Sequence, residues 1–109
     1  MTAPDIRLAA GRALDHLGLT ADEGADRMRA LGIKGRPKLD NACIVSIYLQ
    51  RSVDGVVEVD VLETCAYLYP TGSADAVIVD LPQPVQVLVH RFDSGVYLDL
   101  IQADTAAVA

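Results

Sequence analysis

The sequence predicts one α+β domain in which three short helices precede a three-stranded antiparallel sheet and a C-terminal helix packs on that sheet. Three observations support this class: helix start and stop signals within residues 4–32, alternation of valines with acidic residues over Val56–Leu62, and helical spacing of apolar residues after Pro84. Helices and strands do not alternate along the chain, which argues against a parallel α/β sheet. At 109 residues the chain has the length of a single domain, over residues 1–109.

A helical pair is expected over residues 4–32. Apolar residues recur at helical spacing over 4–17, which predicts the first helix. The second helix starts with Thr20 and Glu23, spaced as a capping box in which each side chain accepts a hydrogen bond from the other residue's backbone N–H. Gly32 ends it, because glycine readily adopts the left-handed conformation that follows a helix.

Residues 40–52 fit two structures. Asp40 is a good N-cap residue, and Leu39 and Ile44 have the spacing of a hydrophobic staple, which favours a helix. β-Branched residues in the same segment and the turn signal Asp54–Gly55 favour a hairpin instead. Because two start signals agree, we expect a helix with Asp40 as its N-cap.

Three strands are expected, over Val56–Leu62, Thr64–Tyr69 and Ala76–Leu81. Alternation in the first strand predicts a core-facing side formed by Val57, Val59 and Val61, and a solvent-facing side with Glu58 and Asp60. The last helix starts near Pro84 and follows an i, i+3, i+4, i+7 pattern of apolar residues: Val85, Leu88, Val89 and Phe92. Tyr97–Ile101 is expected to form a short turn, and residues 102–109 a frayed tail.

The net charge of −6 is unevenly distributed. Residues 1–40 hold seven Arg or Lys against six acids, whereas residues 41–109 hold two Arg against nine acids. This balance disfavours unspecific binding of polyanions by the whole domain. No apolar run exceeds five residues, so we expect no membrane segment and no signal peptide. The expected location is the cytoplasm, with both cysteines reduced.

Residues with the chemistry for catalysis are few. A nucleophile–base pair could combine Cys43 or Cys65 with His90, but a free cysteine in an apolar run is usually a core residue. The two cysteines and two histidines match no zinc spacing, and no glycine-rich phosphate loop is present in the sequence. We therefore predict that the protein is not an enzyme, with no catalytic residues, no metal and no cofactor.

Lys34-Gly35-Arg36-Pro37-Lys38 resembles the core of an AT-hook, in which Gly-Arg-Pro lies in the minor groove of A·T-rich DNA. The resemblance implies local contacts to nucleic acid by Lys34, Arg36 and Lys38, because narrow minor grooves attract arginine. An AT-hook usually has arginine at the position of Lys34, and here the motif lies between folded elements. The alternative is a polar connection in which Gly35 and Pro37 punctuate a turn.

The second strand predicts a different binding surface. One face of this strand carries Cys65, Tyr67 and Tyr69, and the other face carries Ala66 and Leu68. Both faces are therefore apolar, although the single C-terminal helix is expected to cover only one of them. An uncovered face would make Tyr67 and Tyr69 an interface, because tyrosine supplies a large contact area at low entropy cost. The alternative is that the N-terminal helices cover this face.

Two segments carry a resemblance to a known group. They resemble a pattern in small uncharacterised proteins of actinobacteria and their phages. The first segment is Asn41–Leu49, and the second is Leu81–Leu100, which contains the stretch Phe92-Asp-Ser-Gly-Val-Tyr97. In that pattern a Cys-Pro-Ile-like helix precedes a small sheet and a Phe-Asp-x-Gly-x-Tyr helix end, and Ile44 stands here in place of the proline. The resemblance implies a shared fold and no activity.

Three functions follow from these observations. We expect a small non-enzymatic cytoplasmic interaction or regulatory protein, with a protein partner or self-association and no membrane partner. The first alternative is a regulator that contacts DNA through residues 34–38. The second is an acidic inhibitor of phage type that imitates nucleic acid, which requires the acids to form a row on one surface.

Overall fold

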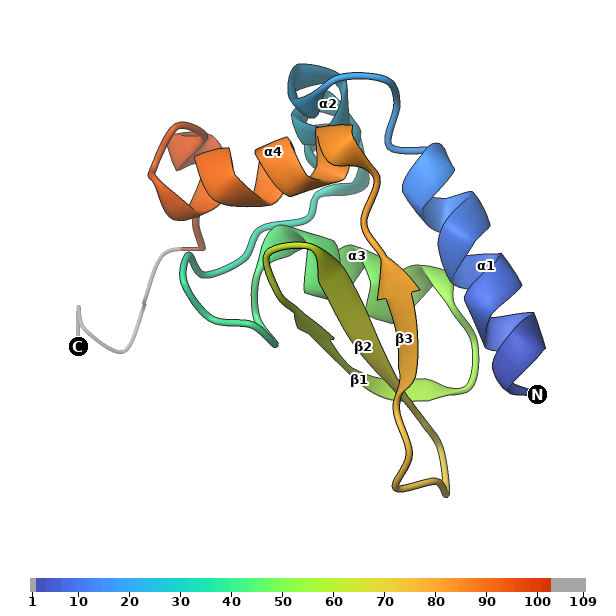
Figure 1. Ribbon diagram of the computed structural model, residues 1–109. Coiled ribbons are helices and arrows are strands. Elements are labelled where there is room, and N and C mark those ends of the chain that lie inside the picture. The colour runs from blue at the N-terminus through green and yellow to red at the C-terminus, as the bar shows by residue number, and fades with distance from the viewer. Residues whose placement is uncertain (1, 103–109) are drawn as a thin grey trace, which may run out of the picture.

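The computed structural model describes residues 2–102, so most of the predicted tail lies outside the described residues. The elements are α1 (Ala3–Asp15), α2 (Ala21–Leu31), α3 (Ile44–Ser52), β1 (Val56–Val61), β2 (Cys65–Pro70), β3 (Val77–Asp80), α4 (Gln83–Asp93) and a short 3-10 helix, η1 (Leu98–Leu100). Figure 1 shows their arrangement. The predicted α+β class is confirmed, with three helices ahead of the antiparallel sheet and one after it.

Threonine side chains start the first two helices. Thr2 and Asp5 form a complete capping box at α1, in which each side chain accepts a hydrogen bond from the backbone N–H of the other residue. At α2 the Thr20 hydroxyl accepts from the N–H of Glu23, as predicted. The Glu23 carboxylate, however, accepts from the N–H of Leu19 at 2.7 Å, because a left-handed glycine turn before the helix brings that amide to it. The predicted capping box at α2 is therefore only half formed.

The third predicted helix forms, but it begins three residues later than expected. Its N-cap is Cys43, whose Sγ accepts from the N–H of Ser46 at 3.4 Å, while the Ser46 hydroxyl donates to the Cys43 carbonyl at 2.8 Å. Asp40 lies in the preceding turn, where its carbonyl accepts from the N–H of Val61 at 2.7 Å. With Cys43 as the N-cap, Leu39 and Ile44 no longer have the positions of a hydrophobic staple, and Leu39 is 46% exposed. Contacts with the sheet thus hold this turn outside the helix.

The three strands pair antiparallel in the order β1-β2-β3. One face of the sheet is buried and carries Val59, Val61, Ala66, Leu68, Val77 and Val79. The prediction that Val57 shares this face is wrong, because Val57 is 56% exposed. The register shifts between Val56 and Glu58, and this bulge interrupts the alternation that the sequence suggests.

Helices α1 and α3 form the layer that covers the buried face. α3 packs on β1 and α1 on β3, and the two helices contact each other. The C-terminal helix does not cover the sheet as predicted, since α4 packs on α2 and α3 instead (Figure 1). A close approach fixes this arrangement: a Cβ atom at Gly24 of α2 would lie 2.8 Å from Leu88 of α4. The helix that follows β3 is thereby drawn to the helical layer.

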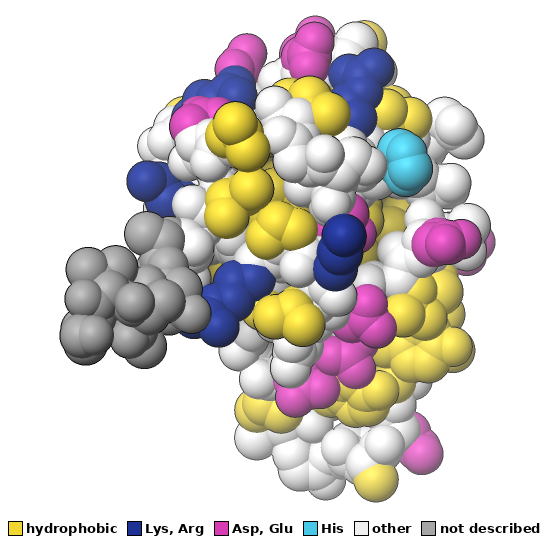
Figure 2. Space-filling model, turned by 90° about the vertical axis from the view of Figure 1, so that its left-hand side faces the viewer, with side chains coloured by type: hydrophobic (Ala, Val, Ile, Leu, Met, Phe, Trp, Pro, Cys, Tyr) yellow, Lys and Arg dark blue, Asp and Glu magenta, His cyan; other side chains and the backbone are white. Residues whose placement is uncertain are grey.

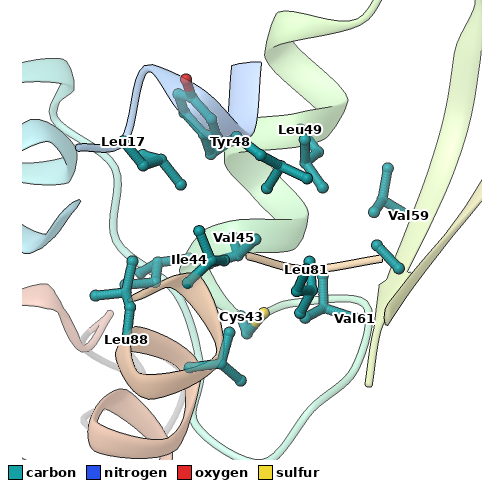
Figure 3. Close-up of a cluster of buried hydrophobic side chains, with 14 of the residues drawn as sticks. Leu17, Cys43, Ile44, Val45, Tyr48, Leu49, Val59, Val61, Leu81 and Leu88 are labelled. Atoms are coloured by element: carbon teal, nitrogen blue, oxygen red, sulfur yellow. The ribbon is translucent and has the colours of Figure 1, made fainter. Parts of the chain in front are cut away.

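Side chains from helices and sheet meet in one core (Figure 3). α3 contributes three apolar side chains with no exposed surface: Ile44, Val45 and Leu49. Leu88 reaches this cluster from α4, and Val59 from β1. Burial of each such side chain stabilises the fold by about 1.5–3 kcal/mol before the entropy cost of ordering it. Among the largest fully buried side chains of the described residues, Leu68 alone comes from the sheet, and the others come from the helices and the loops between them.

Candidate functional site

The side of the sheet that faces away from α1 and α3 carries aromatic and acidic side chains. We call it the open sheet face, and its residues are Glu58, Asp60, Cys65, Tyr67, Tyr69, Ile78 and Asp80. Tyr67 and Tyr69 are half-buried, and Ile78 is 48% exposed. Because the helices that contact the sheet lie in one layer on its other side, no helix within residues 2–102 covers these side chains.

Carboxylates stand beside the tyrosines of the open sheet face. The strand register places Glu58 opposite Tyr69 and Asp60 opposite Tyr67. Repulsion by the Asp60 charge raises the pKa of Glu58 above its ordinary value. Desolvation raises the pKa of Tyr69, and the charges of Asp60 and Glu58 add to that shift. The ring of Tyr69 therefore lies in a field of negative charge.

The basic loop, residues 33–39, is held against the body of the protein by its backbone. The side chains of Lys34, Arg36 and Lys38 are exposed, as contact with a phosphate backbone requires. Gly35 between them is buried. Its N–H donates to a carbonyl of η1 at 2.9 Å, and its carbonyl accepts from the N–H just past η1 at 2.8 Å. The chain thus bridges η1 and the start of α3.

The position of Gly35 bears on the resemblance to an AT-hook. A Cβ atom there would lie 2.6 Å from the Ala42 carbonyl oxygen and 2.8 Å from the Ile44 nitrogen, so backbone encloses the residue. An AT-hook needs its Gly-Arg-Pro backbone free to lie in a minor groove. In this fold the three basic side chains can reach a phosphate, but Gly35 cannot enter a groove without leaving the body of the protein.

The sequence did not predict the groove of about 670 Å³ between α4, the β1–β2 turn and residues 38–40. Its lining includes Lys38, Asp40, Glu63, Gln86, His90 and Asp93. The N–H of Lys38 donates to the Asp93 carboxylate at 2.8 Å and anchors the basic loop to α4. The lining comes from three separate segments that only packing brings together, so no local pattern could have revealed it.

The cysteines and His90 lie in different environments. Cys43 is buried, and burial raises the pKa of its thiol, which disfavours the thiolate that a nucleophile needs. Its sulfur serves instead as the N-cap of α3. Cys65 is half-buried on the open sheet face, while His90 is exposed in the groove. No hydrogen bond of the described residues joins either cysteine to His90.

The acidic side chains do not form one row on the surface shown in Figure 2. Figure 2 shows one short run of adjacent acidic side chains on the lower half of this surface, and hydrophobic and basic side chains separate the other acidic groups from it. Imitation of a phosphate track needs a continuous row, so this surface lends the inhibitor alternative no support. Within residues 2–102 no group of three His, Cys, Asp or Glu residues is placed to hold a metal ion.

The residues predicted to bind partners fall into two separate sets, the basic loop and the tyrosines of the open sheet face. No hydrogen bond or ion pair between described residues joins the two sets. The same part of the chain contains no helix with the length and hydrophobicity to span a bilayer.

Comparison of the sequence and the fold with protein-family models, curated proteins and solved structures finds no match.

Proposed function

We propose that this chain is a small non-enzymatic protein that acts by binding another protein through its open sheet face. One observation carries the proposal: the helices cover only one side of the sheet, and the other side presents Tyr67 and Tyr69. A sheet this small normally buries one apolar face, and rows of aromatic side chains on the other face are typical of interfaces. Ile78 extends the apolar surface next to Tyr67.

The non-enzymatic part of the proposal rests on the use that the fold makes of its reactive groups. The thiol of Cys43 caps a helix within the core. His90 lies on an exposed helix surface, and no hydrogen bond of the described residues orients it. The proposal keeps the expected cytoplasmic location, where the two free thiols stay reduced. A protein without a reactive site can still regulate a partner, by binding to the partner's surface and blocking it.

Affinity capture with matched variants tests the proposal. The wild-type chain, a Tyr67→Ala/Tyr69→Ala variant and a Leu19→Ala control are each immobilised and exposed to an extract of the source cell. Leu19 is 85% exposed and lies outside the sheet, so the control removes apolar surface elsewhere. Circular dichroism checks that all three chains fold.

We expect a protein that binds the wild type and the control and is lost from the tyrosine variant. Capture that is equal on all three chains contradicts the proposal. So does turnover of a small molecule that requires Cys43 or His90. Salt-sensitive binding of A·T-rich duplex DNA that Arg36→Ala weakens favours the DNA alternative instead.

A further inference from the structure

The strand side chains of the open sheet face carry charge of one sign, while Arg7 of α1 donates to the backbone carbonyl of Ile78 at the edge strand β3 at 3.5 Å. The strand positions of this face include three carboxylates, Glu58, Asp60 and Asp80, and neither Lys nor Arg. The ion pairs of residues 2–102 are Arg29 with two aspartates of the α2–η1 region and Arg91 with an aspartate of α2, so none of them neutralises this face. A partner that docks here must either bring positive charge or bury three carboxylates without compensation, which is costly.

The carboxylates and the aromatic rings are arranged as pairs. Glu58 lies opposite Tyr69 and Asp60 lies opposite Tyr67 on neighbouring strands. Side chains in directly opposed positions have Cβ atoms about 4.5–5.5 Å apart. A group that touches one ring therefore also lies within reach of a carboxylate. The ligand that suits this surface is flat on the side that meets a ring and positively charged at its edge.

The same chain already shows how such a set of groups holds a cation. Arg29 lies over the ring of Tyr97, with its Cζ atom 5.7 Å from the ring centroid. Its guanidinium also pairs with Asp26 at 2.6 Å and with Asp99. This contact raises the pKa of Arg29 and lowers the pKa of Asp99, as expected for mutual stabilisation of opposite charges. One tyrosine and two carboxylates thus form a seat for a guanidinium.

We infer that the open sheet face binds an arginine-bearing segment of a partner protein, with a guanidinium over Tyr67 or Tyr69 and next to Glu58 and Asp60. The inference rests on the function proposed above and adds the chemistry of the partner. Arginine fits better than lysine because its planar group stacks on a ring and donates to a carboxylate at the same time. A symmetric dimer through this face would oppose carboxylates with carboxylates, which disfavours a second copy as the occupant.

Peptide titration tests the inference directly. The probe is a blocked eight-residue peptide of alternating valine and arginine, compared with peptides in which lysine or citrulline replaces every arginine. Citrulline keeps the planar shape of arginine without its charge. Binding to the full-length, ¹⁵N-labelled protein is followed through backbone amide shifts, at low and at physiological salt.

We expect the arginine peptide to shift amides of β1 and β2, the lysine peptide to bind roughly threefold or more weakly, and the citrulline peptide not to bind. Asp60→Asn should weaken binding of the arginine peptide about threefold to tenfold, since one desolvated charge contact is lost. Asp15→Asn is the matched control, because it removes the same charge from the end of α1. It should leave the affinity unchanged.

Several results would overturn the inference. Equal affinity for the arginine and citrulline peptides would show that the charge of the ligand has no role. An equal loss of affinity for the arginine peptide in Asp60→Asn and Asp15→Asn would show a general effect of the protein's net charge. Shifts that map to the groove or to α1 place the peptide elsewhere. Dimerisation that Tyr67→Ala abolishes identifies a second copy as the occupant. If no arginine peptide binds but captured protein is still lost from the tyrosine variant, the inference fails while the proposed function stands.

Discussion

The phenol of Tyr48 in α3 donates a hydrogen bond to the carbonyl oxygen of Ala13 in the last turn of α1. Carbonyls in the last turn of a helix have no partner within that helix, so this contact satisfies a group that would otherwise be buried without a hydrogen bond. It also joins the two helices that cover the sheet. Tyr48→Phe should lower the free energy of unfolding by about 1–2 kcal/mol, measured by urea denaturation.

The ionisation of Tyr48 reports on the burial of the same side chain. Burial raises the pKa of this phenol above its ordinary value of 10.0. The unfolded chain therefore loses the proton at lower pH than the folded chain does, and stability falls as the pH rises above about 10. Tyr48→Phe should make this decline shallower. An equally steep decline in the variant would assign the alkaline effect to other tyrosines.

Two glycines should respond in opposite ways to the same substitution. Gly35→Ala places a methyl group against the backbone of Ala42 and Ile44, so the free energy of unfolding should fall by about 1–3 kcal/mol. Gly11, within α1, has no neighbour within 4 Å of the added atom. Gly11→Ala should stabilise the protein by about 0.5–1 kcal/mol, because alanine is the better helix former. Thermal unfolding of both variants measures the difference, and similar shifts in Tm would contradict the described packing of the basic loop.

Local patterns were sufficient to predict most of the elements. The cap at Thr20, the glycine end of α2 and the alternation in β2 depend on neighbours within four residues, and each is present in the structure. The α+β class followed from these signals. The two faces of β2 were also predictable, since alternation alone places Ala66 and Leu68 opposite to the tyrosines.

Features that depend on distant contacts could not be predicted in the same way. The start of α3 is set by a hydrogen bond from Val61 to Asp40, and the exposure of Val57 by a bulge in the pairing with β2. The position of α4 depends on its fit against Gly24 of α2. The groove draws its lining from three segments. In each case the deciding partner lies far away in the sequence.

The two cysteines should differ in reactivity toward a thiol reagent. Cys43 is 3% exposed and its thiol pKa is raised by burial, whereas Cys65 is half-buried on the open sheet face. In the folded protein at neutral pH, iodoacetamide should modify Cys65 roughly tenfold or more faster than Cys43. Peptide mass spectrometry over time gives both rates. Comparable rates would show that α3 opens readily or that its cap is not formed, and a denatured sample, where the rates should converge, is the control.

Glu58 should report directly on the charge of Asp60. The Asp60 carboxylate raises the pKa of Glu58, so Asp60→Asn should return it toward its ordinary value. The pKa of Tyr69 should also fall in this variant, by less, because desolvation is the main cause of its shift. Side-chain carbon shifts followed by NMR between pH 2 and 12 measure both values, and Asp15→Asn should change neither. An unchanged pKa for Glu58 in Asp60→Asn would show that the two carboxylates do not share a face, which would contradict the register of β1 and β2.

Saturation with the arginine peptide should also lower the pKa of Glu58 in the wild type, since a bound guanidinium favours the ionised carboxylate.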